Sequence, residues 1–471
     1  MKKKVIGRMM RFLAGFFLCK RANMPRFIQS VLKEKQNLLF GLVLFCVFFL
    51  VVFFLWPGTI RPDTLSQLSQ AKSGIYSDAN PPVMAMFWHF LYVLLPGSGL
   101  MFLTHMILLF LTLLVCGIIF KPLHLKWFYA VIFFWPQVFF SAQFVSKDIA
   151  FAFSFLMVAS VLAFYTTKKE PMPWFVALVL FVLLFYGTGV KYQARFVLPI
   201  YAFWFVSCLR PQDSMKNLLI KATIVFSLVF GATQAVQHLA NVRQTHFWQW
   251  VKLFDLAAIS LKEKKDLIPA FNKQDPQGDF MAELAKRFNP ERVNEIGSDP
   301  KIEPLLRLGK DDRERDQLWD AWFDAVKTHP TSYLKHRLRL LMLILKKSPI
   351  KGLGESSQRG EVFPSLAQRV IKFGEDKGFL QIVKALTPFI YYLPMMIFYT
   401  FFGAVYARQT AFAKVLFLLN GSGLFLMLAL VPFSMASDVR YLYFTMCSFH
   451  FSHPFFMRAM RQVKKNIGRI Q

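Results

Sequence analysis

Acidic residues are scarce in this chain. Its 471 residues include 27 Asp and Glu against 56 Lys and Arg, which gives a formal net charge of +29 at pH 7. An excess of this size is common in proteins that bind nucleic acid. Most of these basic residues, however, flank long apolar runs, where positive charge orients a membrane protein. We therefore expect a lipid bilayer as the partner of this charge, and no nucleic acid.

Cysteine is also rare, and nothing in the sequence reads as a cleavable leader. The five cysteines lie in or beside apolar segments and lack the spacing of metal ligands, which argues against a disulfide framework or a zinc site. The short apolar patch at 12–19 is not followed by a small-residue cleavage site. We expect residues 1–36 to form a basic amphipathic segment on the cytoplasmic face of the membrane.

Apolar residues, by contrast, are abundant. Hydrophobic residues make up 55% of the chain and aromatic residues 17%, and the mean hydropathy is +0.40. This composition is foreign to soluble domains and typical of helical membrane proteins with several spans. The predicted fold is an all-α integral membrane bundle of about 10 transmembrane helices. The apolar runs that predict them are 38–56, 100–120, 127–140, 149–165, 174–188, 196–209, 218–236, 383–402, 415–433 and 441–456.

The charge at the two ends predicts the topology. Residues 1–36 and 458–471 are basic and poor in acid, so both ends are expected in the cytoplasm and the number of crossings is even. We take the membrane to be the cytoplasmic membrane of a bacterium. The remaining parts are seven helices over 37–236 with a first outer loop at 57–98, a long outer segment at 237–380, and three helices over 381–457.

The long outer segment has a mixed composition. Residues 261–316 are charged and rich in Pro, Gly and Asp, which is typical of a solvated insert. The run 338–345 has about eight residues where about 20 are needed to cross a bilayer, so it predicts a helix lying in the membrane interface. We expect the segment to be a lid over the site. The alternative is that His336 or Arg337 contacts a substrate directly.

Ionisable residues gather at one edge of the predicted bundle. They are nearly absent from the middle of the apolar runs, where His105 is an exception. A coupled transporter is expected to carry ionisable groups near the midplane, whereas an enzyme whose substrate has a lipid tail needs its chemistry at the headgroup level. The outer-edge candidates are Asp63, Asp78, Lys147, Asp148, Lys191, Arg195, Asp438 and Arg440.

Short stretches at these outer connections resemble a known superfamily. Asp63, residues 74–76 and Asn80-Pro81-Pro82 are similar to the first outer loop of the GT-C glycosyltransferases. Ser146-Lys147-Asp148 resembles the second acidic outer loop of that superfamily. Residues 191–195 and 437–443 resemble a basic motif and a terminal motif of related bacterial membrane proteins. The resemblance implies an enzyme that takes a sugar from a polyprenyl-phosphate donor, as do the protein O-mannosyltransferases and the aminoarabinose transferase of lipid A.

The candidate residues suit this chemistry. The attacking hydroxyl of a cell-envelope acceptor, lipid or glycan, needs a base, and the carboxylate of Asp63 can accept its proton in an inverting displacement. Asp78 and Asp148 are candidates for a second acid. Only single aspartates occur, so no metal site is predicted and a role for a divalent cation stays open. The departing phosphate needs cations, for which the candidates are Arg195, Arg440, Lys191 and Lys147.

Each acidic candidate also has a purely structural interpretation. Asp63 can cap a helix predicted over 64–72. Asp78 lies in a sequence with strong turn chemistry. Lys147 and Asp148 can form a local ion pair at the start of a span, where Asp148 also suits the helix dipole.

The basic candidates have structural alternatives as well. Lys191 and Arg195 can extend toward lipid phosphates without binding a substrate. Asp438 and Arg440 can form a salt bridge with each other. We favour function for Arg440, because an arginine at the outer edge runs against the usual charge bias of membrane proteins.

Two other functions stay open at this point. A flippase or transporter for lipid-linked sugars predicts movement of the substrate across a vesicle without covalent change, and polar residues at the midplane. A membrane scaffold without chemistry predicts that substitution of Asp63 has no effect on the cell surface.

Overall fold

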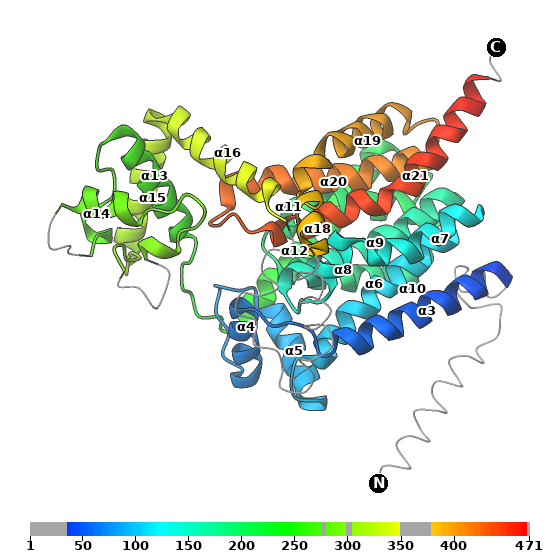
Figure 1. Cartoon of the computed structure of the whole chain (residues 1–471), viewed down its shortest axis with the longest axis horizontal. Helices are drawn as coiled ribbons and strands as arrows, with labels where there is room; N and C mark the ends of the chain where they lie inside the picture. The colour runs from blue at the N-terminus through cyan, green and yellow to red at the C-terminus, as the bar shows by residue number, and fades with distance from the viewer. Residues whose placement is uncertain (1–34, 275–278, 298–303, 349–377, 469–471) are drawn as a thin grey trace, which may run out of the picture.

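The computed structural model describes residues 35–274, 279–297, 304–348 and 378–468, and no strand is formed in that part of the chain (Figure 1). The predicted all-α fold is confirmed. Most of the basic segment predicted at 1–36 lies outside the described residues, as does 349–377 in the long outer segment.

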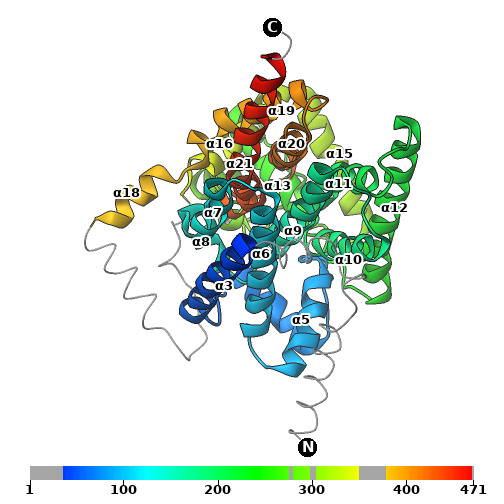
Figure 2. The ribbon, with the colours of Figure 1, turned by 90° about the vertical axis from the view of Figure 1, so that its right-hand side faces the viewer.

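Five helices of the described chain are long and apolar enough to cross a membrane. The central one is α9, because 89% of its most apolar window is buried and it packs against α6, α10, α11, α20 and α21. Figure 2 shows α3 and α12 on different sides of the bundle, where only 17% of each window is buried. Their exposed faces are apolar, as lipid contact requires. The five are α3 (Lys35–Leu55), α6 (Gly99–Ile119), α9 (Lys147–Lys168), α12 (Met215–Leu239) and α20 (Ala411–Phe433).

Other predicted spans are present as shorter or more polar helices. They are α10 (Trp174–Val190), α11 (Ala194–Leu209), α19 (Leu393–Tyr406) and α21 (Tyr443–Ile467). α21 packs against α9 and α20 in the middle of the bundle. Length and composition alone therefore establish an apolar helical bundle, but not the predicted number of about 10 crossings.

The predicted span at 127–140 is broken in the structure. It forms α7 (Leu123–Val131), a short 3₁₀ turn, and α8 (Pro136–Ala142). Trp135 has ψ 130°, because the residue before a proline is pushed out of the helical region. The continuous span expected there is thus replaced by two short helices.

The predicted span at 383–402 is also broken next to a proline, although Thr387 before it keeps a helical ψ of -10°. α18 (Phe379–Leu386) ends before Pro388, a 3₁₀ turn follows, and α19 begins at Leu393. A proline in a helix interior removes a backbone donor and clashes with the preceding turn. Each broken run therefore places polar backbone inside the bundle, where it needs partners from other helices.

A glycine turns the chain out of the first span. Gly58 has φ +87°, and a Cβ there would lie 2.8 Å from Phe102 and 2.9 Å from Val145. Only glycine adopts this conformation in so little space. The first outer loop then forms two packed helices, α4 (Pro62–Ser73) and α5 (Pro82–Leu94). α4 covers the predicted helix at 64–72, whereas α5 was not predicted.

Residues 249–274, 279–297 and 304–346 form a domain with a hydrophobic core of its own, which we call the outer domain after the predicted outer segment. Figure 1 shows this domain beyond one end of the bundle, joined to it along α16. Residues 312–346 form two helices that meet at His329, and the run 338–345, predicted as an interfacial helix, lies in the second of them. The domain contains α13 (Gln249–Glu263), α14 (Phe280–Arg287), α15 (Asp312–Thr328) and α16 (Pro330–Lys346).

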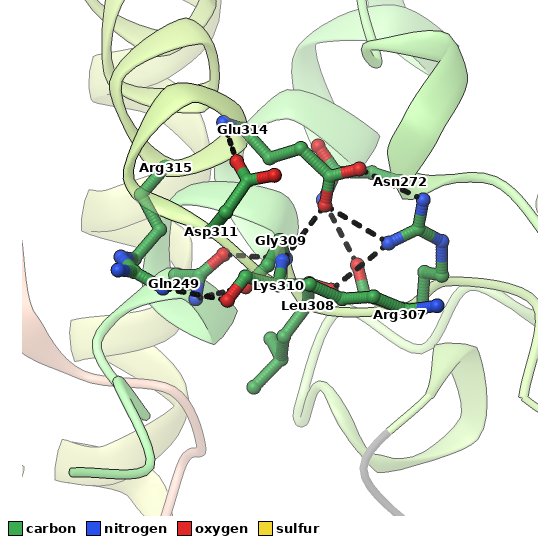
Figure 3. A network of polar contacts seen from close by, with 9 residues as sticks. All are labelled: Gln249, Asn272, Arg307, Leu308, Gly309, Lys310, Asp311, Glu314 and Arg315. Atoms are coloured by element: carbon green, nitrogen blue, oxygen red, sulfur yellow. Dashed lines mark hydrogen bonds and ion pairs between the residues drawn. The ribbon is translucent and has the colours of Figure 1, made fainter.

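A polar network fixes the start of α15 in this domain (Figure 3). Arg307 forms two parallel ion-pair contacts with Glu314, of 3.0 and 3.1 Å. The side chain of Gln249 accepts from the amide of Gly309 at 2.8 Å, and Asp311 caps α15 by accepting from the amide of Glu314 at 2.8 Å. Paired arginine and carboxylate groups give such contacts geometric specificity. The described residues of this domain therefore form a packed unit, whereas the composition of 261–316 predicted a solvated insert.

Candidate functional site

Asp63 and Arg440 meet at the edge of the bundle that the charge pattern predicts to face outward. Arg440 Nη1 lies 2.6 Å from Asp63 Oδ2. Arg440 comes from the short turn before α21, and Asp63 lies in the first turn of α4. Asp63 does not cap α4 through its side chain, so the capping interpretation does not describe its contacts. Its side chain is 36% exposed, which leaves it open to a substrate.

Asp148 and Lys191 form the buried base of the same arrangement. Lys191 Nζ lies 2.6 Å from Asp148 Oδ1, and their side chains are 3% and 1% exposed. The other oxygen of Asp148 lies 3.6 Å from Arg440 Nε. Lys191 is therefore held by a carboxylate and does not extend to lipid. Asp148 pairs with Lys191 and Arg440, in place of the local pair with Lys147.

Asp438 and Arg61 complete the arrangement on its exposed side. Asp438 Oδ2 lies 2.8 Å from Arg440 Nε, so the salt bridge between these two neighbours is present. Arg61 lies 3.9 Å from Asp438 and stacks over the ring of Phe144 at 4.0 Å. We call these groups, with Lys147, the outer-edge cluster: Arg61, Asp63, Lys147, Asp148, Lys191, Asp438 and Arg440.

Backbone pairing brings the two acidic loops together. The amide of Thr59 donates to the carbonyl of Gln143 at 2.8 Å, and the amide of Val145 donates to the carbonyl of Thr59 at 3.0 Å. The hydroxyl of Thr64 donates to the carbonyl of Val145 at 2.7 Å. Because these bonds join the segment before α4 to the segment before α9, Asp63 and Asp148 reach the same arginine.

Lys147 connects the cluster to the first outer loop. Its Nζ donates to the side-chain oxygen of Asn80 at 2.5 Å. Asn80 begins the Asn-Pro-Pro stretch before α5. Lys147 also acts electrostatically on Asp63 and Asp148. The cluster thus joins residues from four separate parts of the sequence, which are 61–63, 147–148, 191 and 438–440.

The cluster stabilises negative charge. Burial opposes the ionisation of Asp63, but Arg440 and Lys147 outweigh it and hold the pKa of Asp63 below its usual 3.8. Burial also opposes the charge on Arg440, but Asp438 and Asp63 raise its pKa well above the usual range. Four cations face three carboxylates in this cluster, so it can accept one further anionic group at low electrostatic cost.

Two of the predicted site residues lie outside the cluster. Asp78 accepts from the amides of Thr245 at 2.6 Å and His246 at 3.2 Å, and so ties the first outer loop to the segment after α12. Arg195 donates from Nε to the carbonyl of Tyr192 at 2.8 Å. Among the described residues Arg195 makes no ion pair. Asp78 has the contacts of a structural residue, and Arg195 has a free charge.

His336 and Arg337 lie inside the outer domain. Arg337 is fully buried and lies 2.5 Å from Asp255, which also accepts from Trp322 Nε1 at 2.9 Å. His336 lies 3.7 Å from Asp255. Burial, together with Arg337, lowers the pKa of His336 to about 3, so the ring is neutral at physiological pH. These positions place both side chains in the packed interior, away from any substrate.

The outer domain holds the segment that leads to Arg440. Arg337 Nη1 donates to the carbonyl of Ser434 at 2.6 Å. The amide of Val293 donates to the carbonyl of Met435 at 3.2 Å. The amide of Ser437 donates to the carbonyl of Glu291 at 2.7 Å. The segment 434–438 is therefore fixed by the outer domain, which makes the domain a support for the site as well as a cover.

Some residues with plausible roles escaped the sequence analysis. Arg61 lies two residues before Asp63 and was not predicted as a site residue. Within α21, His450 pairs with Gln137, and His453 Nδ1 lies 3.0 Å from the hydroxyl of Tyr399, so His105 is not the sole histidine of a predicted span. Gln137 also donates to the carbonyl of Thr387 at 2.5 Å. The contacts of Gln137 supply hydrogen-bond partners to polar groups at the two breaks in the predicted spans.

Within the described part of the chain, no group of three or more His, Cys, Asp or Glu could hold a metal ion. No family model, curated protein or solved structure matches the chain. The function of the chain is therefore inferred from the geometry of the outer-edge cluster.

Proposed function

We propose that this chain is a GT-C-like membrane glycosyltransferase that moves a sugar from a polyprenyl-phosphate donor to a cell-envelope acceptor. One observation carries the proposal. A partly exposed, ionised Asp63 lies 2.6 Å from Arg440 in a cluster with excess positive charge. A base next to a phosphate-binding cation is what the transfer requires.

The proposed reaction is a single displacement. The acceptor hydroxyl oxygen forms a bond to the anomeric carbon while the bond from that carbon to the phosphate oxygen breaks. Asp63 takes the proton of the hydroxyl, and the polyprenyl phosphate leaves with the bonding electrons. Arg440 and Lys147 stabilise the phosphate as charge grows on it. Attack opposite the leaving group inverts the anomeric centre.

The proposed setting is the outer face of a bacterial cytoplasmic membrane. It requires the shorter helices to cross the bilayer together with the five long ones, to a total of about 10 spans with both termini in the cytoplasm. The basic residues at the end of α21 favour that orientation. The outer-edge cluster would then face the compartment where lipid-linked sugars are used.

The proposal is tested with purified protein, a polyprenyl-phosphate sugar and cell-envelope extracts. Asp63→Asn removes the base, and loss of a general base lowers the rate by roughly 10²–10⁴-fold. The matched control is Asp320→Asn, because Asp320 is an exposed carboxylate of the outer domain. The proposal fails if Asp63→Asn and Asp320→Asn transfer sugar at equal rates.

A further inference from the structure

An apolar groove lies between α11, α12 and α20. It has a volume of about 610 Å³ and is lined by residues that include Ile200, Phe203, Phe226 and Phe425. Binding sites for organic ligands have volumes of about 300–1,000 Å³. Figure 2 shows α12 at the edge of the bundle beside α11. The groove thus has the size of a ligand site in a part of the bundle that borders lipid.

The lining of this groove excludes a polar ligand. Thr223 and Ser422 are its hydroxyl residues, and the Ser422 hydroxyl already donates to the carbonyl of Leu419 at 2.8 Å. Its lipid side is open, because Leu219 and Phe425 are 54% and 47% exposed. A hydrocarbon chain satisfies such a surface without any unpaired polar group.

A free cation lies beyond the outer end of the groove. The guanidinium of Arg195 lies 5.9 Å from the ring of Phe230, which stacks at 5.8 Å on Phe226 of the groove wall. Arg195 lies one helical turn before Pro199, another wall residue of α11. Among the residues that the structure describes, no carboxylate pairs with it. A guanidinium next to an apolar groove is complementary to a lipid with a hydrocarbon chain and a phosphate headgroup.

We propose that this groove binds one hydrocarbon chain of a phosphate-bearing lipid, whose phosphate lies on Arg195. Lys191, four residues before Arg195, belongs to the outer-edge cluster. A lipid seated in this way presents its phosphate on the side of the bundle that carries the cluster. The identity of this lipid as the sugar donor rests on the proposed function, but the groove and its charge do not.

The test measures binding to the full purified chain in detergent. The probe is dodecyl phosphate with a photoreactive group at the end of its chain, and the cross-linked residues are identified by mass spectrometry. Dodecanol with the same group tests the need for the phosphate, and inorganic phosphate as competitor tests whether the headgroup alone suffices. We expect cross-links on α11, α12 and α20, weak labelling by dodecanol, and little competition by inorganic phosphate.

Two variants with matched controls test the two halves of the site. Gly421→Leu fills the groove, because a Cβ at Gly421 meets nothing closer than 3.8 Å and can be built without strain. Its control is Gly231→Leu, at an exposed position of α12 outside the groove. Arg195→Gln removes the cation, and its control is Arg210→Gln at the other end of α11. We expect Gly421→Leu and Arg195→Gln to weaken binding roughly 10- to 100-fold, and the controls to bind as the unsubstituted chain does.

The outcomes separate this inference from the proposed function. Equal binding by all four variants would overturn the groove assignment, even in a protein that transfers sugar. Competition by inorganic phosphate at the affinity of the probe would overturn the role of the hydrocarbon chain. Binding that depends on Gly421 and Arg195 in a protein without any transfer activity would support the groove and contradict the glycosyltransferase.

Discussion

Asp63 differs from Asp148, the buried carboxylate of the outer-edge cluster, in its exposure. Its side chain is 36% exposed, whereas that of Asp148 is 1% exposed and pairs with Lys191. The exposed acid can meet a substrate, and the buried one can only orient its neighbours. We therefore propose different roles for the two residues. Asp63 acts as the base, and Asp148 holds Arg440 in position.

The pH dependence of transfer tests the state of Asp63. Because the pKa of Asp63 is held below 3.8 by Arg440 and Lys147, the base is lost only as the pH falls through that lowered value. The acid limb of the kcat/KM profile should therefore lie below about pH 3.8. Arg440→Gln removes the charge that lowers the pKa of Asp63 most. The acid limb of this variant should therefore lie at a higher pH. Identical acid limbs in the two proteins would remove Asp63 from the mechanism.

The buried ion pair at the base of the cluster gives a second prediction. Lys191→Met removes the closest partner of the buried Asp148 and leaves Arg440 at 3.6 Å, which costs up to about 3–5 kcal/mol in the free energy of unfolding. The double variant Asp148→Leu/Lys191→Met should recover most of this loss, because no unpaired charge is left. Thermal unfolding in detergent measures both effects. Transfer by the double variant should stay low, and full activity would show that Asp148 does not support Arg440.

At the scale of elements, the outer domain determines where Arg440 lies. Arg337 of α16 bridges Asp255 in the domain and the carbonyl of Ser434, at the start of the segment that ends at Arg440. The sequence predicted a lid here, or direct contact of Arg337 with a substrate. The contacts indicate a support, since Arg337 is fully buried and its partners belong to the protein.

A pair of substitutions tests this support. Arg337→Leu alone leaves Asp255 unpaired in the core and should destabilise the domain by about 3–5 kcal/mol. The double variant Asp255→Leu/Arg337→Leu should regain stability while the carbonyl of Ser434 still lacks its donor. We expect transfer by the double variant to fall roughly 10- to 100-fold, since small displacements of a catalytic group are costly. A stable double variant with normal kcat would contradict the role of the outer domain in positioning.

The sequence predicted the helices better than the tertiary contacts between them. Long apolar runs specify α3, α6, α9, α12 and α20, because burial in lipid leaves few alternatives to a helix. The breaks at Pro136 and Pro388 were missed, although both prolines stand in the sequence, because hydropathy averaged over a window does not register a single residue. The meeting of Asp63, Asp148 and Arg440 depends on long-range packing, which no local pattern encodes.

At the scale of the whole molecule, the account requires the outer-edge cluster to face away from the cytoplasm. Positive charge at the end of α21 and at Lys168, the last residue of α9, favours this orientation. The outer domain, α4 and α5 lie toward one end of the bundle in Figure 1, and α4 carries Asp63 of the cluster. A single labelling experiment can therefore orient all three.

Cysteine labelling of intact cells tests this topology. Ile75→Cys lies in the first outer loop at a position that is 70% exposed, and it should react with a maleimide that cannot cross the membrane. Lys168→Cys, at the other end of the bundle, should react only after the cells are opened. The unsubstituted chain gives the background from native cysteines. The reverse pattern would place the cluster in the cytosol and exclude the proposed setting.

The fate of the donor in liposomes tests the central claim most directly. Purified protein is reconstituted with a polyprenyl-phosphate sugar and an acceptor extract, and free polyprenyl phosphate is measured together with glycosylated acceptor. We predict that the two products appear in equal amounts and that both form roughly 10²–10⁴-fold more slowly with Asp63→Asn. Transfer of the intact donor from one leaflet to the other, without release of polyprenyl phosphate, would contradict the account.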